Sequence, residues 1–544
     1  MVNKKDIKLK NKKLPTKFIE EEMKVVEDDL DKIRTSPLMY ISRVGSLGAT
    51  HLSKECINNN VDECRNPNSP GEYIYINLNE DTNTFVSEDD GRGLPFDKMY
   101  DACTKMQSST KFNRTSNQKS AGQNGCGMKA TNALSDLFKL EVWKLGEYAQ
   151  VKFENGVPIE KGKVVKCKDK EKHGTRVTFR PSEKYMGPCQ MKGEDLLGWL
   201  NNIKHFLDPG IFMEVEIEKK GKVVRYEMER STNGIADLIK EMSKSNHTAI
   251  VRCQGKAYVD EDVRIVEAGG KVKDIVMNRE IELEFAFALN AERQEPMYRS
   301  FCNFVHTIDE GDHTTAVQTA ICEYLCKKTR DILSDKEKEK YTIQHIDVTN
   351  SLVLALTVST SMDPGFTGQT KEKIENSKFI KPLKDIVKNK LEEHFNDNPK
   401  ELKRFTDVVK ASAKARYDAT KARNKVIKKE VGAAEHGIPN YFPANNKSKR
   451  AYREFFIFEG LSVKSNGTQA RDPEYQAMFT MRGVPGEGYT MDSNTVYEKN
   501  EIFHSLVRAV GAGIGDNFNV NDCRFAKVII TSDGDWIHNG PTWK

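Results

Sequence analysis

The sequence predicts a multidomain protein of α+β and α/β class. Its 544 residues are enough for three or four domains of ordinary size, and a hydrophobic content of 38% can give each of them a core. Short strands alternate with helices over residues 51–232, apolar strands and long charged helices follow, and two further apolar runs occur after residue 451. We therefore expect domains over residues 1–232, 233–428 and 451–544, with a linker over residues 429–450.

Charge, hydropathy and cysteine spacing exclude several classes of protein. The 85 basic and 80 acidic side chains leave a net charge of only +5, so any nucleic-acid contact must come from local patches. No apolar run reaches the roughly 18 residues of a membrane span, and the basic N-terminus lacks the apolar stretch of a secretion signal. The eleven cysteines include no CxxC pair and are expected to be reduced core thiols. We expect a cytoplasmic protein with no membrane partner.

The first block predicts an α/β sandwich with a single sheet. A lysine-rich arm and an acidic helix over residues 20–33 precede it, and the helix ends before Ser36 and Pro37. Four short segments then supply strands, and they are YIYINL, TFVSED, KLEVWKL and RVTFRP. Strands in one layer and helices in the other are typical of such a sandwich.

The second and third blocks contain apolar strands and long helices. In the second block the strands IELEFAFAL and SLVLALTVS are separated by a helix over residues 314–333. Charged helices follow over residues 380–395 and 401–429. The last helix is basic and amphipathic, which fits a solvated link between domains as well as a surface that faces DNA. The third block opens with FFIF and closes with KVIITSDGDW, and both runs resemble buried parallel strands that end in acidic residues.

A polar helix face in the first block is the first candidate for chemistry. If residues 51–64 form a helix, Glu55, Asn59 and Asp62 lie on one face, with His51 one turn earlier. A carboxylate placed there can orient and deprotonate water, and an amide oxygen can ligate Mg²⁺. The same pattern also fits an ordinary solvated helix face.

Two glycine-containing segments follow. VSEDDGRGLP places Asp89 at a strand end before Gly91 and Gly93, where the carboxylate can accept a hydrogen bond from an amino group such as that of adenine. An ordinary Asp-Gly turn would have the same sequence. In SAGQNGCGMKATNALS three glycines lead directly into a helix, whose N-terminal N–H groups and dipole suit phosphates. The segment is not a P-loop, because the Lys-Ser/Thr pair is absent from it.

In this order and spacing the three segments resemble the N-terminal ATPase of the GHKL superfamily. They are most similar to its type II topoisomerase branch, the B subunit of DNA gyrase and its viral and eukaryotic relatives. Three further segments extend the similarity: residues 300–317 look like the N-T-x-x-G-G-T-H segment of the family, residues 365–374 like its Gln-Thr-Lys loop, and residues 173–182 like its Gly-Thr strand. The resemblance covers about residues 33–537 and implies a GHKL ATPase sandwich, a ribosomal-S5-like transducer domain and a partial TOPRIM domain.

The resemblance also implies roles for residues of the nucleotide site. Glu55 corresponds to the general base for the attacking water, and Asn59 to the Mg²⁺ ligand. Asp89, supported by Thr175, corresponds to the residue that reads the adenine amino group. The other implied residues are Gly91, Arg92 paired with Glu63, Gly93 and Pro95 near the base, Lys111, Gly122, Gln123, Asn124, Gly125, Cys126 and Gly127 around the phosphates, and Gln369 and Lys371 reaching the γ-phosphate from the second domain.

A second site is implied in the third block. Residues 451–488 and 503–536 resemble the two halves of TOPRIM, in which Glu459, Asp533 and Asp535 would hold Mg²⁺ for cleavage of DNA. This chain departs from the family pattern, because Leu461 and Ile537 stand where acidic residues are common and Val484 stands where lysine is usual. Metal affinity, ion number or cleavage strength is therefore expected to differ from that of the family.

The main hypothesis is the ATPase, transducer and TOPRIM portion of a type IIA DNA topoisomerase. The chain ends nine residues after Asp535, so we expect a phage-type large subunit that is split or truncated within TOPRIM and works in the host cytoplasm. Its expected partners are duplex DNA, a second copy bound through the ATPase domain, a subunit that carries the cleavage tyrosine, and a chain that completes TOPRIM if the subunit is split. The lysine-rich first fifteen residues are a candidate dimerisation arm or a disordered tail.

Two other classes of function remain open from the sequence. One is a nucleotide-gated DNA clamp or regulatory ATP-binding protein with a non-functional TOPRIM remnant, which the substitutions in TOPRIM favour. The other is a chaperone or repair ATPase that shares only the nucleotide fold, which the presence of TOPRIM disfavours.

Overall fold

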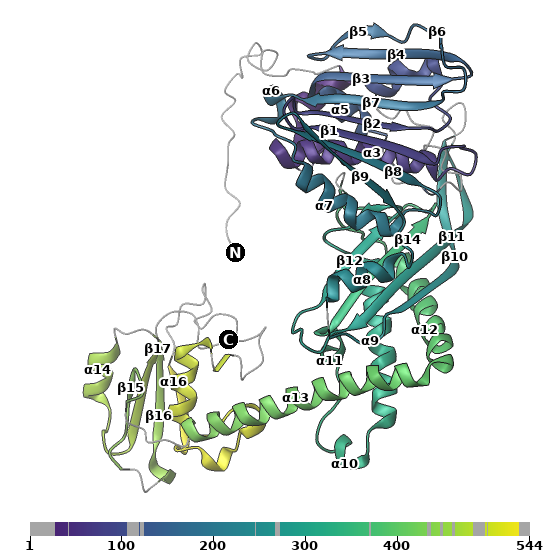
Figure 1. Cartoon of the computed structure of the whole chain (residues 1–544). Helices are drawn as coiled ribbons and strands as arrows, with labels where there is room; N and C mark the ends of the chain where they lie inside the picture. The colour runs from purple at the N-terminus through teal and green to yellow at the C-terminus, as the bar shows by residue number, and fades with distance from the viewer. Residues whose placement is uncertain are drawn as a thin grey trace, which may run out of the picture. The chain divides into compact units, whose positions relative to one another are not determined.

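The structure of the chain is a computed structural model (Figure 1). It describes residues 28–41, 43–105, 119, 125–244, 246–266, 272–368, 371–431, 437–446, 450–459, 463–481, 496–497 and 499–531. The chain forms two compact units, of which the first holds residues 1–338 and 343–412 and the second holds residues 339–342 and 413–544. No helix in the described ranges is long and apolar enough to span a membrane.

A nine-stranded sheet is the framework of the nucleotide-site residues. Its main path runs β5-β4-β3-β7-β2-β1-β8-β9, with β6 paired to β4. All its pairs are antiparallel except β1 with β8. The strands are β1 (Tyr73–Asn79), β2 (Thr84–Asp89), β3 (Ser135–Lys144), β4 (Glu147–Glu154), β5 (Val157–Lys161), β6 (Val165–Lys166), β7 (Gly174–Pro181), β8 (Phe212–Lys219) and β9 (Lys222–Glu229). The single-sheet sandwich expected from the sequence is confirmed.

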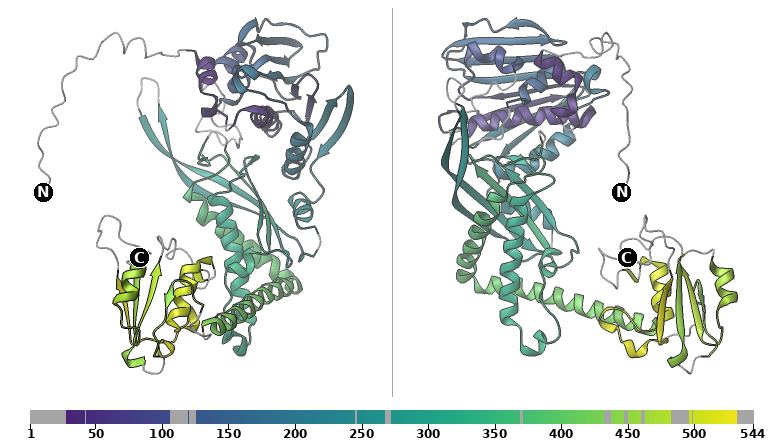
Figure 2. Two further views of the ribbon diagram at one scale, coloured as in Figure 1. Left: turned by 90° about the vertical axis from the view of Figure 1, so that its left-hand side faces the viewer. Right: turned by 180° about the vertical axis from the view of Figure 1, so that it is seen from behind.

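Helices cover one face of this sheet (Figure 2). They are α2 (Asp29–Thr35), α3 (Gly45–Cys64), α4 (Met99–Thr104), α5 (Gly127–Ala133), α6 (Glu183–Met186) and α7 (Gly193–Ile203). The Asp28 carboxylate caps α2 by accepting the N–H groups of Leu30 and Asp31, so the described part of the expected acidic helix begins there. Alternate residues of β2 are buried, which turns Phe85, Ser87 and Asp89 toward the helices.

The second sheet of the first unit has the order β10-β11-β14-β12-β13. Its strands and helices are β10 (Val251–Val266), β11 (Val272–Leu289), β12 (Met297–Cys302), β13 (Val305–His306), β14 (Leu352–Thr360), α8 (Ile235–Ser243), α9 (Asp312–Ile332), α10 (Asp335–Lys338), α11 (Ile346–Thr349) and α12 (Ile380–Asp397). The two apolar strands expected here pair with each other as β11 and β14. The two sheets share one core, in which the rings of Phe206 and Phe301 lie 4.0 Å apart.

The second unit contains a four-stranded sheet of order β15-β17-β16-β18. Its elements are β15 (Tyr441–Phe442), β16 (Glu454–Glu459), α14 (Val463–Ala470), β17 (Gln476–Met481), α16 (Glu501–Val510) and β18 (Lys527–Thr531), and α13 (Pro399–Val431) runs into it from the first unit. β16 pairs in parallel with β17 and β18, as expected. The expectation that KVIIT is buried is wrong, because β18 is an edge strand in the described part of the sheet and Val528 and Ile530 are exposed.

Candidate functional site

An ion pair joins helix α3 to the loop after β14 at the expected catalytic residues. Lys371 Nζ, from the loop after β14, donates a hydrogen bond of 3.3 Å to Glu55 Oε1 on α3. Both side chains are largely buried. The backbone of Lys371 has a φ of 57° and donates to the carbonyl of Gly368. The fold therefore places a cation from the second sheet directly on the candidate base.

The start of α5 packs against the same carboxylate. A Cβ on Gly127 would lie 2.7 Å from Glu55 Oε2, so any larger residue there would displace the Glu55 carboxylate. Cys126 stands at the N-cap of α5, and Gly125 has a φ of 56°, in the left-handed region that favours glycine. The last residues of the glycine-rich segment therefore bring bare backbone to the candidate base.

His51 lies one turn before Glu55 on α3. Burial lowers the pKa of the His51 imidazole, the nearby Glu55 carboxylate opposes this shift, and Lys371 reinforces it. The imidazole is therefore neutral at neutral pH and stands beside a carboxylate and an ammonium group. A neutral imidazole in this position can accept or donate a hydrogen bond without adding charge.

Asp89 ends β2 inside the sandwich, where its side chain is almost fully buried. Burial raises its pKa to about 7, although hydrogen bonds from Asn60, the Gly91 N–H and the backbone of Thr175 act in the opposite direction. The Asn60 amide donates to Oδ2 at 2.7 Å, and the Gly91 N–H donates to Oδ1 at 3.0 Å. Thr175 lies opposite Asp89 in the register of β2 and β7. The carboxyl group is held by donors and remains able to accept another.

The turn after Asp89 is closed by a bidentate ion pair. Arg92 Nε and Nη2 each donate to a different oxygen of Glu63 at 2.9 Å, and its backbone N–H also donates to Glu63. Burial alone would raise the pKa of the Glu63 carboxyl group. The hydrogen bonds from Arg92 outweigh this effect, so the pKa of Glu63 is lowered. A Cβ on Gly91 would lie 2.8 Å from Asp89 Oδ1, and Gly93 has a φ of 71°. Both positions therefore require glycine, and Pro95 follows directly before a short 3₁₀ turn.

The remaining residues expected in the nucleotide site lie farther along α3 or outside the described residues. Asn59 lies on α3 one turn after Glu55 and is half-buried. The neighbouring Asn58 and Asn60 are buried, and their Oδ1 atoms have no hydrogen-bond partner among the described residues. Lys111, Gly122, Gln123, Asn124 and Gln369 lie outside the described residues.

Two polar residues of this region were not expected from the sequence. One is Asn60, for which no role was expected and whose amide donates a hydrogen bond to Asp89. Lys129 lies on the first turn of α5, is only 2% exposed, and has a pKa that burial lowers. Its position two residues after Gly127 was the available signal, because a lysine at the start of a helix after a glycine-rich segment lies where phosphates bind.

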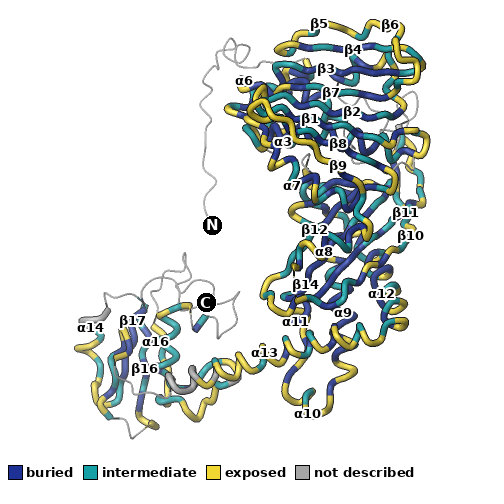
Figure 3. Tube along the Cα trace, viewed as in Figure 1, coloured by how far each residue is buried: buried dark blue, intermediate teal, exposed yellow. Residues whose placement is uncertain are grey.

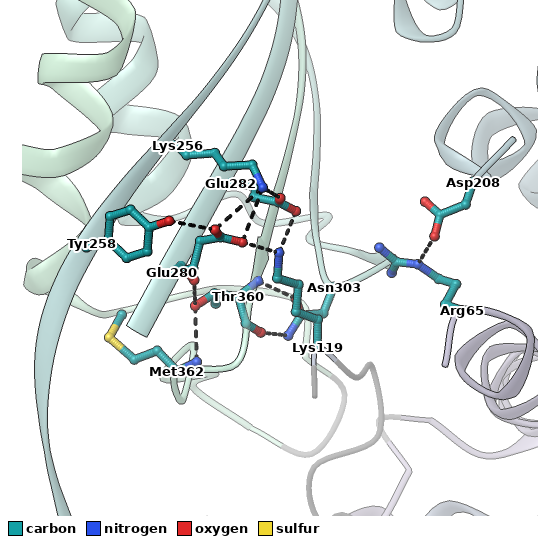
Figure 4. Close-up of polar contacts among 10 residues, drawn as sticks. All are labelled: Arg65, Lys119, Asp208, Lys256, Tyr258, Glu280, Glu282, Asn303, Thr360 and Met362. Carbon is teal, nitrogen blue, oxygen red and sulfur yellow. Dashed lines mark hydrogen bonds and ion pairs between the residues drawn. The ribbon is translucent and has the colours of Figure 1, made fainter. Parts of the chain in front are cut away.

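Lys119, which lies between α4 and α5 in the sequence, contacts the second sheet (Figure 4). Its Nζ lies 2.9 Å from Glu280 Oε1 and 2.5 Å from Glu282 Oε2, both on β11. Lys256 and Tyr258 of β10 also contact these carboxylates. The hydrogen bond from Lys119 is the largest influence on the pKa of Glu280, which is lowered to about 2. The Glu280 carboxylate therefore stays ionised throughout the neutral range.

The second expected site is only partly within the described residues. Glu459 ends β16, and its Oε2 atom is buried without a hydrogen-bond partner in the described ranges. Asp533, Asp535, Leu461, Val484 and Ile537 lie outside those ranges. No group of three His, Cys, Asp or Glu side chains in the described parts of the chain is placed to hold a metal ion.

Known proteins resemble the chain over the same two sheets. Residues 46–184 match the family of histidine kinase-, DNA gyrase B- and HSP90-like ATPases, and residues 234–425 match the DNA gyrase B family. The B subunit of DNA gyrase from Thermotoga maritima is 29% identical over 95% of this chain and 79% of that protein. The B subunit of the type 2 topoisomerase from Aquifex aeolicus is 26% identical over 97% of this chain and 64% of that protein. The chain is gyrase B-like.

Solved structures support the same fold. The 43K ATPase domain of Thermus thermophilus gyrase B has a TM-score of 0.53 and 24% identity, and covers 72% of this chain and 97% of that domain. The topoisomerase IV ATP-binding domain of Francisella tularensis has a TM-score of 0.52 and 23% identity, with coverage of 71% and 97%. These likenesses confirm the expected GHKL ATPase fold and gyrase B-like multidomain α/β architecture.

Proposed function

We propose that the chain is the ATP-hydrolysing, DNA-binding subunit of a type II DNA topoisomerase. The observation that carries the proposal is the contact between Lys371 and Glu55, because it brings a loop of the second sheet to the helix that holds the base. The buried, unpartnered Oδ1 atoms of Asn58 and Asn60 and the bare backbone at Gly127 are consistent with a polar ligand in this space. ATP turnover that depends on Glu55 and Lys371 tests the proposal.

In this proposal, different residues have different roles in ATP hydrolysis. Glu55 takes the proton from the water that attacks the γ-phosphorus, and the neutral His51 imidazole lies one turn before it on α3. Without nucleotide, Lys371 neutralises Glu55, and a γ-phosphate would compete for its ammonium group. Loss of the γ-phosphate after hydrolysis would leave Glu55 as the partner of Lys371. The contact made by the loop after β14 would therefore depend on whether the γ-phosphate is present. Asn59 would supply an oxygen ligand to the Mg²⁺ that accompanies ATP and that neutralises phosphate charge.

Binding of the nucleotide would use the remaining residues. Asp89, held opposite Thr175, accepts the adenine amino group in a turn formed by Gly91, Arg92, Gly93 and Pro95. Lys129 adds a buried cation at the start of α5, beside the phosphates. Lys111, Gly122, Gln123, Asn124, Gly125, Cys126, Gly127 and Gln369 complete the proposed phosphate contacts.

Asp89→Asn is expected to weaken ATP binding by about 10- to 100-fold, the usual cost of a hydrogen bond to a charged group. It should also alter the pH dependence of stability. The Asp89 pKa is raised from 3.8 to about 7 by burial, so wild-type stability falls as pH rises from about 4 to 7, and the variant should lose much of this fall. Titration calorimetry and melting curves at pH 5 and pH 8 measure both effects. An unchanged ATP affinity would remove Asp89 from the site.

The proposed topoisomerase also needs a cleavage site and partners. Glu459, with Asp533 and Asp535, would hold Mg²⁺ beside the scissile phosphate, and the buried free oxygen of Glu459 fits an oxygen ligand set. A second copy of the chain would form the ATP-driven gate, and a partner would supply the cleavage tyrosine. In the described part of the sheet, β18 is an edge strand with exposed apolar side chains, which suits contact with a partner chain.

Glu459→Ala is expected to abolish covalent DNA cleavage complexes formed with Mg²⁺ and a tyrosine-bearing partner subunit. ATP turnover by the same variant should stay at the wild-type rate, because Glu459 belongs to the second unit and the ATP site to the first. Detergent trapping of cleaved plasmid measures the complex. If the wild-type chain yields no complex with any such partner, the alternative of a nucleotide-gated DNA clamp is favoured, and Leu461, Val484 and Ile537 already point in that direction.

A further inference from the structure

Residues 161–172 form a strongly basic border at one end of the nine-stranded sheet. Six of these twelve residues are lysines and two are acidic, a net charge of +4, whereas the whole chain of 544 residues carries +5. Lys161, Lys163, Lys166, Lys168 and Lys170 are all exposed. Figure 3 shows the ends of β5 and β6 in the colour of exposed residues. A positive patch of this density on a nearly neutral chain indicates a surface for an anionic partner.

The backbone of this border is fixed at several points. β6 pairs with β4, and the Cys167 N–H donates to the Gly146 carbonyl at 2.8 Å. The Asp169 carboxylate accepts the N–H groups of Glu171 and Lys172 at 3.0 and 3.2 Å. The lysine side chains therefore project from an ordered base, and less conformational entropy is lost when a partner binds.

Four of the lysines have no acidic partner in the part of the chain that the structure describes. They are Lys163, Lys166, Lys168 and Lys170. Lys172, by contrast, pairs with Glu88 at 3.0 Å and lies 3.9 Å from the centre of the Trp143 ring. Among the described residues, no ion pair joins Asp169 or Glu171 to these four lysines, and the Asp169 carboxylate accepts backbone N–H groups. Binding a polyanion would not require an existing ion pair to be broken.

We propose that Lys163, Lys166, Lys168 and Lys170 form a contact surface for the phosphate backbone of duplex DNA. The choice of DNA over another polyanion rests on the proposed topoisomerase function, whereas the surface itself rests on the charge and order of the segment. Lysines are point charges that follow a phosphate backbone, so binding here is independent of base sequence.

The surface is also connected to the nucleotide site. Residue 172 leads directly into His173, whose Nδ1 lies 3.1 Å from the Gly91 carbonyl in the turn after Asp89. Gly174 and Thr175 then begin β7 beside Asp89. The lysine border is therefore linked along the chain, through residues 172–175, to the turn after Asp89, and it belongs to the same sheet.

The test replaces all four lysines with glutamine in the full chain. Fluorescence anisotropy of a labelled 30-base-pair duplex, measured without ATP from about 50 to 200 mM salt, gives the affinity and its salt dependence. Each phosphate contact contributes about 0.9 to the slope of log affinity against log salt, so loss of four contacts should reduce the slope by about 3 to 4. The control replaces Lys184, Lys192, Lys222 and Lys240 with glutamine, because these lysines are also exposed and the change in charge is identical.

Three outcomes would overturn the proposal. They are an unchanged salt slope in the border variant, an equal loss in the control variant, and a border that binds poly-glutamate but not duplex DNA. ATP turnover without DNA, measured in both variants, separates this surface from the proposed function. A wild-type chain that hydrolyses ATP but gives no lysine-dependent DNA binding contradicts the surface alone, and one that binds DNA but never hydrolyses ATP contradicts the proposed function alone.

Discussion

Glu55→Gln is expected to bind ATP with nearly wild-type affinity and to hydrolyse it at least 100-fold more slowly. The substitution keeps the shape of the side chain but removes the proton acceptor, and general-base catalysis typically contributes a factor of about 10² to 10⁴. The same change removes the ion pair with Lys371, which is only 5% exposed. Breaking a buried ion pair costs about 3 kcal/mol, so the nucleotide-free variant should melt at a lower temperature than the wild type.

A non-hydrolysable ATP analogue should reverse much of that loss, because its terminal phosphate gives Lys371 a new anionic partner. The variant should therefore show a larger analogue-induced rise in melting temperature than the wild type. Glu194→Gln on α7, an exposed site, serves as the control and should change neither turnover nor melting. Wild-type turnover in Glu55→Gln would show that another group accepts the proton.

Lys371→Met is expected to reduce ATP turnover by about 100-fold or more, the typical effect of losing a group that stabilises transition-state charge. The methionine stem keeps the packing of the loop but cannot bind the γ-phosphate. ADP lacks that phosphate, so its affinity should change little, while the preference of the wild type for ATP over ADP should largely disappear. Calorimetric titration of both nucleotides and steady-state turnover measure these effects.

The matched control for this prediction lies two residues away in the same loop. The Lys373 side chain is 44% exposed and pairs with Glu375, so Lys373→Met should leave turnover and nucleotide preference unchanged. If Lys371→Met keeps the wild-type preference for ATP over ADP, the contact with Glu55 is structural rather than part of phosphate sensing.

The sequence predicts the local parts of the site better than the contacts between them. The strand before Asp89, the glycines after it and the helix that carries Glu55 follow from residue patterns, because strand alternation and helical spacing are local properties. The sequence does not show that Asn60 contacts Asp89, since the packed fold decides which side of a helix faces the strand. Contacts such as Lys119 with Glu280 depend on long-range packing, which no single segment encodes.

The expectations for the second unit show the same limit. FFIF and KVIIT have the composition of buried parallel strands, and their parallel pairing as β16 and β18 is confirmed. Burial, however, depends on what lies on the other side of a strand, and the described part of the sheet leaves Val528 and Ile530 exposed. Composition indicates that a strand can be buried, and neighbouring elements decide whether it is.

The position of β1 in the nine-stranded sheet has a consequence for how the protein is made. β1 lies between β2 and β8, and β8 begins at Phe212, more than 130 residues after β1 ends at Asn79. At roughly 5–20 residues per second, the ribosome needs about 7 to 27 s to supply that partner. During this time one edge of β1 is unpaired on the nascent chain, so chaperones that shield strand edges should matter most to this protein early in its synthesis.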